Sequence, residues 1–409
     1  MTLTEQQLID LDDLDLPFVS FTSDEYQADP HGVWRRAREQ SWLARTEIAV
    51  NVIPYKANFE MMRTRQLTTM GDTIMRIQGV LDGPMYRYWT DGLIMCMNDL
   101  RHARLRKLLF PAFTPHSVDR FRPMMREVVH RLVGEFRERG ECDFVKEFSH
   151  RYPVEIMARL LGLPTDDIDV YGQWAVDIGL LFSFPVAPVA DRVEKAISNL
   201  YEYAGKLIED RRRNPGDDLL TTLIQVEEDG ERLTYDELRW QVVNLTFAGH
   251  DTTKNSTTFL MRLFCEHPDQ WQKLREDPGL ANNAIDEGMR FDPVIPATMR
   301  TTVEDFVYDG VRFPPGTPIM LRADTSNRDP AVFEDPDVFD ITRRNADKQI
   351  TFGGGVHYCL GANLARAELQ EALPILAEAM PDVRIVGEAD WRARSSMLLG
   401  AESLPVAFR

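Results

Sequence analysis

The chain has 409 residues, a hydrophobic fraction of 44% and a formal net charge of −18 at pH 7. This length is enough to bury a large core, and so acidic a balance argues against nucleic-acid binding. Residues 1–17 are acidic and polar, so we expect no signal peptide, no membrane anchor and a cytoplasmic protein. No Pro/Gly/Ser-rich linker, low-complexity segment or repeat divides the chain, which predicts a single domain over residues 1–409.

Hydrophobic periodicity predicts a mainly α protein with a small β portion. We expect helices near residues 30–40, 100–110, 119–138, 153–162, 167–182, 189–213, 234–266, 280–291 and 362–379. Short strands are expected at 299–308, at 311–322 and near the C-terminus.

The helix expected near 100–110 contains the run His102-Ala-Arg-Leu-Arg106. Residues four apart lie one helical turn apart on the same face, so both side chains can reach one anion. Taken alone, the segment fits a charged surface helix better than an anion site.

The helix expected over 234–266 starts at a capping box, Thr234 with Glu237, and stops at His267-Pro268. Its centre reads Ala248-Gly249-His250-Asp251-Thr252-Thr253. Glycine there costs about 1 kcal/mol relative to alanine, and β-branched threonine weakens the turn further. Thr252 can hydrogen-bond to the carbonyl of Ala248 and open a groove in the helix. Alone, this run would be an ordinary polar patch on a core helix.

The next helix ends with Glu287-Gly-Met-Arg290. Residues three apart share a helix face, so these two side chains can pair. A glutamate and an arginine at this spacing usually form a solvated ion pair.

Residues 352–366 read Phe-Gly-Gly-Gly-Val-His-Tyr-Cys-Leu-Gly-Ala-Asn-Leu-Ala-Arg. Gly353 and Gly355 allow a tight turn, and a helix begins just after Cys359. The free N–H groups of Leu360 and Gly361 favour a negative sulfur there. The alternative is a buried free cysteine beside a flexible loop.

This loop resembles the heme-binding loop of the cytochrome P450 family of heme-thiolate monooxygenases. The match includes Phe352, Gly353, Gly355, His357, Cys359, Gly361, Leu364, Ala365 and Arg366. Together with the three earlier motifs, it covers residues 98–370 in the family's order. The resemblance implies a soluble bacterial type of cytochrome P450 fold. In that fold heme b lies between the helix expected at 234–266, called the oxygen helix, and the helix after the cysteine loop. Its iron would be bound by Cys359, whose thiolate favours O–O cleavage.

The resemblance also assigns roles to further residues. Thr252 would hydrogen-bond dioxygen and Asp251 would relay protons, while the Glu287–Arg290 pair would support the heme core. Family members often add a third cation near Val338, so here it is missing or supplied by a neighbour such as Arg343. The residues expected to bind heme are His102, Arg106, Ala248, Gly249, Arg300, Phe352, Gly353, His357, Leu360 and Gly361.

The chain leaves no room for a fused flavin reductase and has no dinucleotide or phosphate-loop motif. Electrons are therefore expected from a separate ferredoxin and ferredoxin reductase. Charge complementarity favours docking of the acidic ferredoxin on a basic face beneath the heme. The basic residues of this face are Arg101, Arg104, Arg106, Lys107, Arg343, Arg344 and Lys348, some of which must serve the propionates or the core.

The substrate pocket implied by the resemblance is mostly aliphatic, which fits a hydrophobic terpenoid, steroid, fatty acid or polyketide. Asn244 is the polar exception, either a substrate anchor or a helix-to-helix contact. The expected pocket residues are Met75, Ile77, Val80, Leu81, Met85, Leu93, Ile94, Leu181, Phe182, Phe184, Asn244, Leu245, Phe247, Ala248, Val294, Ile295, Met397 and Leu398.

The predicted activity is hydroxylation of a C–H bond in a hydrophobic small molecule, using dioxygen. A peroxide-driven peroxygenase usually lacks the acid–alcohol pair that Asp251 and Thr252 form. Oxidative coupling, or oxidation of a carrier-bound substrate, would keep every motif and stays open. A non-catalytic heme sensor would need neither the pair nor a basic docking face.

The four cysteines are widely scattered, and the eight histidines show no metal-ligand spacing. Neither a disulfide framework nor a zinc site is therefore expected.

Overall fold

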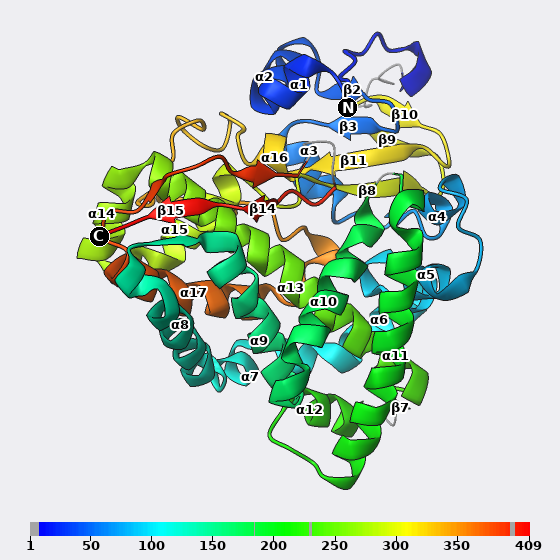
Figure 1. Ribbon diagram of the computed structural model, residues 1–409. Coiled ribbons are helices and arrows are strands. Elements are labelled where there is room, and N and C mark those ends of the chain that lie inside the picture. Colours follow the sequence, from blue (N-terminus) through cyan, green and yellow to red (C-terminus); the bar gives the residue numbers. More distant parts are fainter. Residues whose placement is uncertain (1–7, 184, 229–230, 393–396) are drawn as a thin grey trace.

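Helices fill most of the molecule, and strands gather toward one side of it (Figure 1). This computed structural model describes residues 8–183, 185–228, 231–392 and 397–409. Phe184, one of the expected pocket residues, lies outside the described residues. Every helix expected from the sequence is present, and the mainly α class with a small β portion is confirmed.

The longer helices match the expected ranges to within a few residues, whereas most of the short ones were not predicted. The helices are α1 Asp24–Ala28, α2 Pro30–Gln40, α3 Tyr55–Met61, α4 Thr73–Ile77, α5 Gly83–Arg87, α6 Asp99–Leu109, α7 Pro115–Asp119, α8 Arg122–Phe136, α9 Arg151–Leu160, α10 Ile168–Gly179, α11 Ala190–Arg213, α12 Leu219–Gln225, α13 Tyr235–Glu266, α14 Pro268–Glu276, α15 Ala281–Phe291, α16 Ala323–Ser326 and α17 Ala362–Ala379.

The largest sheet has five strands in the order β2-β3-β11-β8-β4, with β3 and β11 parallel and the other neighbours antiparallel. Two three-stranded sheets, β1-β10-β9 and β12-β15-β5, and the pairs β13-β14 and β6-β7 complete the β portion. The strands are β1 Ile9–Asp10, β2 Leu43–Arg45, β3 Val50–Val52, β4 Leu67–Thr68, β5 Glu141–Asp143, β6 Glu227–Glu228, β7 Glu231–Arg232, β8 Ala297–Thr302, β9 Phe306–Tyr308, β10 Val311–Phe313, β11 Pro318–Arg322, β12 Arg384–Ile385, β13 Asp390–Trp391, β14 Ala401–Ser403 and β15 Pro405–Ala407.

The strands expected at 299–308 and 311–322 were wrong in extent, because each range holds two strands in different sheets. Between β10 and β11 the chain runs through Pro314-Pro315-Gly316, where φ of Gly316 is +81°. Proline has no backbone N–H to donate to a strand ladder, so the pairing stops there.

Helix α13 runs unbroken through the core, beginning at the predicted capping box and ending before His267. Gly249 permits close packing on α9, because a Cβ there would lie 2.5 Å from the sulfur of Met157. The glycine that weakens the helix locally therefore allows a tight helix crossing. Apolar side chains from α8, α9, α10, α11, α13 and α17 form the main core around it.

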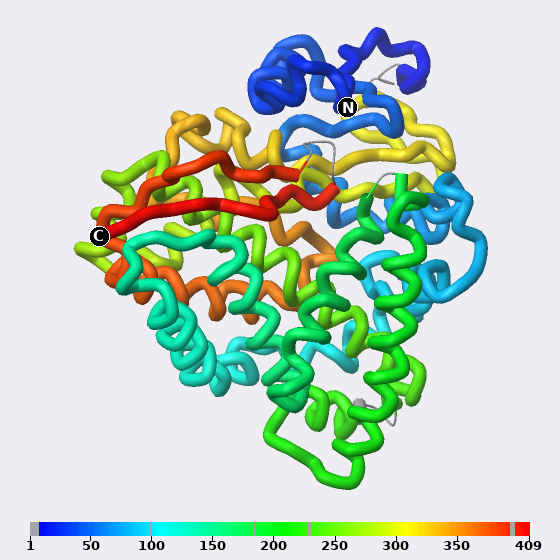
Figure 2. The backbone as a smooth tube through the Cα atoms, viewed as in Figure 1, coloured from blue at the N-terminus to red at the C-terminus, as the bar shows by residue number. Residues whose placement is uncertain are grey.

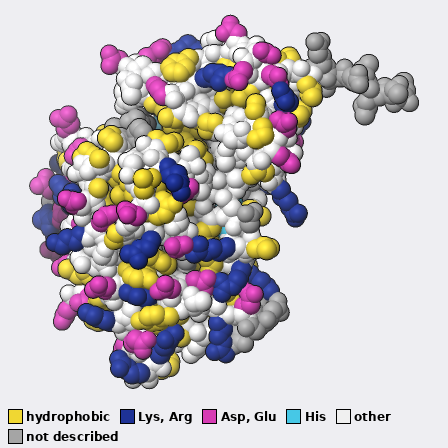
Figure 3. All heavy atoms as spheres, turned by 90° about the vertical axis from the view of Figure 1, so that its right-hand side faces the viewer, with side chains coloured by type: hydrophobic (Ala, Val, Ile, Leu, Met, Phe, Trp, Pro, Cys, Tyr) yellow, Lys and Arg dark blue, Asp and Glu magenta, His cyan; other side chains and the backbone are white. Residues whose placement is uncertain are grey.

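The C-terminal segment returns across the molecule, where β15 pairs with β5 (Figure 2). On the side of α4, α5 and α11, charges of both signs are interspersed with apolar side chains (Figure 3). Among the described residues, no helix combines the length and apolar character needed to cross a bilayer.

Candidate functional site

The cysteine loop folds as its glycines predict. Gly353 and Gly355 have φ of +75° and +63°, and the N–H of Cys359 donates to the carbonyl of Phe352 at 2.9 Å. A Cβ on Gly355 would lie 2.5 Å from the carbonyl oxygen of Met62, so only glycine fits against α3. The loop therefore holds Cys359 just before α17, as the sequence indicates.

The thiol of Cys359 is enclosed deep in the fold, yet its side chain has accessible surface. Burial raises its pKa, while the N–H of Gly361 and the charge of Arg106 act in the opposite direction. A coordinated metal cation would deprotonate such a thiol outright. The loop and α6 thus each supply one influence that favours the thiolate, and a metal would supply a third.

A basic cluster lies beside this loop. The ring centroids of His102 and His357 stand 4.3 Å apart, and Nδ1 of His357 is buried without a hydrogen-bond partner among the described residues. Burial, with the charges of Arg300, His102 and Arg106, lowers the pKa of His357 to about 3. Burial also lowers the pKa of Arg300 to about 10. The cluster holds two cations, Arg106 and Arg300, together with two imidazole rings and no anion among the four side chains, so it suits a bound anion.

The middle of α13 carries other residues that the resemblance places at the heme, and we call it the second wall of the candidate site. Ala248 is exposed and Thr252 half-buried, although the residues on either side of Ala248–Gly249 are buried. The Thr252 hydroxyl donates to the Ala248 carbonyl at 2.9 Å, as predicted, without breaking the helix. Accessible surface thus occurs within the fold both on α13 and at Cys359, which is what a group bound between them requires.

The Glu287–Arg290 pair is fully buried and bidentate, with N–O distances of 2.7 and 2.9 Å. The Arg343 Nε donates to Glu287 at 3.1 Å, so Arg343 supplies the third cation. The carbonyl of Val338 accepts from both arginines. The alternative donor suggested by the sequence is therefore in place, and this network ties α15 to the loop that precedes the cysteine motif.

Most expected pocket residues join the main apolar core around α13. Phe182 and Phe247 stack at 4.9 Å, and Trp89, which the sequence analysis missed, lies 5.9 Å from Phe182. Ile77 and Leu81 lie outside this core and are 66% and 61% exposed, so their place in the pocket stays a prediction. Those that are buried or packed on the core are Met75, Val80, Met85, Leu93, Ile94, Leu181, Phe182, Leu245, Phe247, Val294, Ile295 and Leu398; Met397 is half-buried.

Asn244 is buried and donates weakly, at 3.4 Å, to Gln241 one turn earlier on the same helix. This contact is within α13 and is not the helix-to-helix bond considered as the alternative. Its role as a substrate anchor stays a prediction.

The side chains of Asp251 and Thr252 hydrogen-bond to different partners. Both oxygens of Asp251 accept hydrogen bonds from Arg392, at 2.9 and 3.2 Å. Sequence reasoning missed Arg392, since it stands 141 positions away in a segment without a motif. No local pattern could have revealed it.

The expected ferredoxin face is smaller than its sequence suggests. Arg343 belongs to the buried network, so it is one of the listed basic residues that serve the core. Arg101 pairs with Asp91, and Arg104 with Glu237 and Glu231. Lys107, Arg344 and Lys348 remain exposed.

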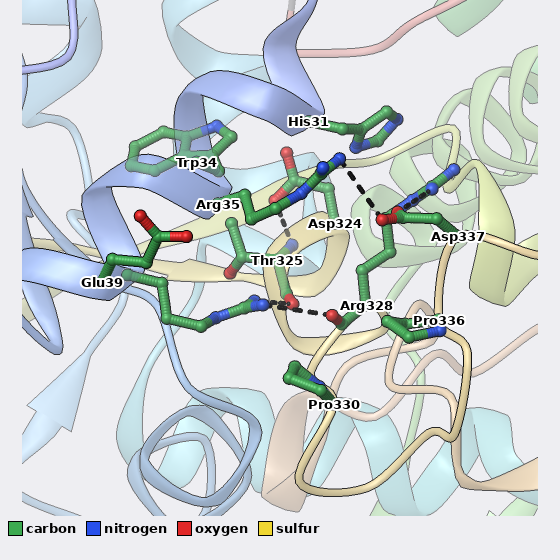
Figure 4. Close-up of a pocket in the computed structure, with 11 residues that line it drawn as sticks. His31, Trp34, Arg35, Glu39, Asp324, Thr325, Arg328, Pro330, Pro336 and Asp337 are labelled. Carbon is green, nitrogen blue, oxygen red and sulfur yellow. Dashed lines mark hydrogen bonds and ion pairs between the residues drawn. The ribbon is translucent and has the colours of Figure 1, made fainter.

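A separate hollow of about 320 Å³ lies between α2 and residues 324–337 (Figure 4). Arg38 donates there to the carbonyls of Thr325 and Arg328, while Arg35 and Arg328 both pair with Asp337. These groups bind one another and fasten α2 to the core. The hollow is lined by none of the expected heme or pocket residues.

Three comparisons with known proteins, by family model, by sequence and by structure, identify the class of protein. The family model Cytochrome P450 matches residues 171–278 and 279–377. Luteothin monooxygenase of Streptomyces thioluteus is 36% identical over 397 residues, 96% of each chain. Vitamin D(3) 25-hydroxylase of Pseudonocardia autotrophica is 36% identical over 318 residues, 77% of each chain. The crystal structure of P450BioI with a hexadec-9Z-enoic acid ligated acyl carrier protein has a TM-score of 0.86 at 26% identity, covering 94% of this chain and 100% of that one.

A loop cysteine opposite an oxygen helix, beside a buried basic cluster, defines a heme-thiolate protein. The chain belongs to the cytochrome P450 family and is a cytochrome P450 monooxygenase that uses heme iron. The residues present fit that cofactor, since the accessible thiol suits the iron and the unbalanced basic cluster suits the carboxylates of heme.

Proposed function

We propose that this enzyme hydroxylates a C–H bond of a hydrophobic small molecule, with electrons from a separate ferredoxin and ferredoxin reductase. The observation that carries the proposal is an accessible stretch of α13 next to an aromatic cluster. Ala248 and Thr252, one turn apart, are accessible, and Phe247, the residue before Ala248, stacks on Phe182. An apolar molecule held against these rings would lie beside the threonine.

The chemistry of each residue suggests its role in holding the cofactor or delivering a proton. Cys359 would hold the iron, and His102, Arg106, Arg300 and His357 would hold the propionates. The bound cofactor supplies the activation of dioxygen that the thiolate promotes. The Thr252 hydroxyl would present a proton on the substrate side, where the apolar rings exclude water.

The substrate class follows from the wall and from the relatives. The wall is formed by aliphatic and aromatic side chains, with Asn244 as a buried amide. One relative is named for vitamin D(3), and others are named steroid C26-monooxygenases. A hydrophobic molecule with one polar group, hydrogen-bonded by Asn244, fits this lining.

The first experiment is the absorption spectrum of the purified protein, reduced and exposed to carbon monoxide. A strongly red-shifted Soret band is expected from thiolate ligation. Candidate hydrophobic compounds are then screened by their spin shift, and products are identified with ferredoxin, reductase and dioxygen. A band typical of histidine ligation, or binding without any oxygenated product, would contradict the proposal. The Asn244→Leu variant should lose affinity or regioselectivity for the compound found.

The docking face proposed for ferredoxin consists of exposed Lys107, Arg344 and Lys348. Leu100, 87% exposed on α6, adds an apolar group of the kind that stable docking needs. Arg344→Glu should slow electron transfer by several-fold at low salt and less at high salt. Arg36→Glu, on α2, is the control. Equal reduction rates for Arg344→Glu and the parent at all salt concentrations would refute this face.

A carrier-bound substrate is the second candidate, favoured by one observation. The similar P450BioI structure holds an acyl carrier protein, and a further neighbour is a cytochrome P450 of a polyketide synthase. The exposed Ile77 and Leu81 flank the end of α4, where a carrier could deliver its chain. Acyl carrier proteins loaded with fatty acids should then produce a larger spin shift than the free acids. Equal shifts would leave the free molecule as substrate.

A further inference from the structure

Asp251 is held by a residue of the C-terminal hairpin. Nη1 and Nη2 of Arg392 donate to its two oxygens at 2.9 and 3.2 Å, and Nδ2 of Asn255 donates to one of them at 3.2 Å. The Thr252 hydroxyl is meanwhile bonded to the Ala248 carbonyl. In this arrangement the carboxylate is fully occupied and turned to Arg392, so it passes no proton to Thr252.

Arg392 also reaches outward. Its Nε donates to Glu402 at 2.8 Å, and Nζ of Lys254 lies 3.3 Å from the other oxygen of Glu402. The Asp251 side chain is 3% exposed, that of Arg392 23% and that of Glu402 50%. The ion pairs therefore connect buried Asp251 to the surface residue Glu402, and Arg392 binds both carboxylates.

The hairpin that carries Arg392 is seated on α13. Trp391 packs on Phe259 at 5.6 Å, and the N–H of Arg392 donates to the carbonyl of Gly400 at 2.9 Å. A Cβ on Gly400 would lie 2.3 Å from the Asn255 amide oxygen, so the backbone touches the helix there. These contacts hold the backbone of Arg392 in place, while its guanidinium hydrogen-bonds to two carboxylates, those of Asp251 and Glu402.

We propose that Arg392 is a positioning residue for proton supply, which holds Asp251 as a carboxylate and releases it by turning toward Glu402. The release keeps the Nε bond to Glu402 and breaks the two bonds to Asp251. The freed carboxylate can then take a proton from solvent and turn to Thr252. This role rests on the proposed function, because it concerns the proton path of the same oxygenation.

The charges around Asp251 support the assignment. Burial would raise the pKa of Asp251, but the charge and hydrogen bonds of Arg392 outweigh it and the pKa is lowered. His250, bonded to His150 at 3.0 Å, has its pKa lowered by burial to about 3 and is neutral. The pKa of His150 is likewise lowered by burial.

The remaining cation, Lys254, already binds Glu402, and Arg151 on α9 pairs with Glu135. Among the described residues facing Asp251, Arg392 is therefore the cation that does most to keep the carboxyl ionised, and Lys254 adds a smaller contribution.

The first test uses apoprotein and infrared spectroscopy of protonated carboxyl groups. Arg392→Gln should produce a carboxyl band that titrates at a higher pH than in the parent, because burial, which raises the pKa of Asp251, is then no longer outweighed by Arg392. The band should vanish in the Arg392→Gln/Asp251→Asn double variant, and Arg392→Lys should suppress it by restoring the charge. Arg312→Gln, which removes a surface pair with Asp10, is the matched control. Absence of the band in a folded Arg392→Gln protein would overturn the assignment of Arg392.

The second test uses the holoenzyme and the surface variant Glu402→Gln. Removing the outer carboxylate should keep Arg392 on Asp251, slowing proton-dependent turnover by about fivefold and enlarging the solvent isotope effect. Substrate affinity, read from the spin shift, should not change. Turnover and isotope effect equal to the parent would refute the release step. Failure of the carbon monoxide spectrum would refute the heme-thiolate function itself, while the infrared result on apoprotein would stand.

Discussion

The two walls of the proposed heme site, the cysteine loop with α6 and the middle of α13, take their polar partners from different distances along the chain. On the cysteine side, the ligand, its N–H donors and Phe352 fall within ten positions, and His102 and Arg106 share one turn of α6. On the oxygen-helix side, Asp251 is bound by Arg392 of the C-terminal hairpin. The first wall is fixed by local geometry, and the second depends on a contact that can open. We expect the first wall to determine cofactor binding and the second to determine when protons are delivered.

The largest effect should come from the cysteine wall. Cys359→Ser should abolish both the red-shifted carbon monoxide band and hydroxylation, because a serine hydroxyl is not a thiolate ligand. Cys265→Ser, a free cysteine in α13, is the control and should keep both. A Cys359→Ser protein that still shows the thiolate band would contradict the assignment of Cys359 as the iron ligand, and with it the comparison of the two walls.

Removing the hydroxyl on the other wall should leave the cofactor in place. Thr252→Ala should lower product formed per electron by about 10²-fold, with the missing electrons recovered as peroxide. Thr257→Ala is matched to it, since Thr257 makes the same bond to the carbonyl four residues earlier but is buried. Well-coupled turnover in Thr252→Ala would show that this wall does not time proton delivery.

The basic cluster should matter for affinity and not for coupling. Arg106→Leu should weaken heme binding about 10- to 100-fold, the value of a charged hydrogen bond to a propionate. Arg101→Gln, on the same helix but paired with Asp91, should bind heme like the parent. Apoprotein titrated with heme gives both constants. An Arg106→Leu protein of unchanged affinity but poor coupling would reverse the division between the two walls.

The smallest effect concerns Glu368 on α17, behind the cysteine wall. Its carboxyl is buried, neither oxygen is hydrogen-bonded to a described residue, and burial raises its pKa well above 4.5. Folding therefore favours the protonated acid, so this group's contribution to stability is full below pH 4.5 and falls as pH rises toward the folded pKa. The loss is about 1.4 kcal/mol per pH unit within that window.

Glu368→Gln should accordingly unfold at the same temperature as the parent at pH 4 and at a higher temperature at pH 8. Glu371→Gln is the contrasting variant, because Glu371 pairs with Arg122 and Arg126 and its loss should destabilise at pH 8. Thermal unfolding of the apoproteins measures both. A Glu368→Gln protein no more stable than the parent at pH 8 would mean that the carboxyl has a partner after all.

The sequence predicts the cysteine wall well for the same reason that the wall is rigid. Glycine positions, a capping box and one-turn spacings are local, so Cys359, His102 with Arg106, and the capped start of α13 are readable in order. Arg343 could be suggested only as a neighbour of Val338, because its bond to Glu287 depends on how a loop returns. Arg392 and Trp89 act through contacts between distant segments, and nothing in their local sequence marks them. The expected strands failed where Pro314-Pro315 ends a ladder that hydrophobic patterning continues.

The close approach of Gly355 to the carbonyl of Met62 has a consequence for biogenesis. Synthesis proceeds from the N-terminus, so α3 leaves the ribosome long before the loop that must close against it. The strand that pairs with β5 follows later still. The thiolate pocket is therefore completed only when almost the whole polypeptide has been made, and cofactor capture is a step of maturation after translation. A cell short of heme should accumulate full-length apoprotein rather than stalled nascent chains.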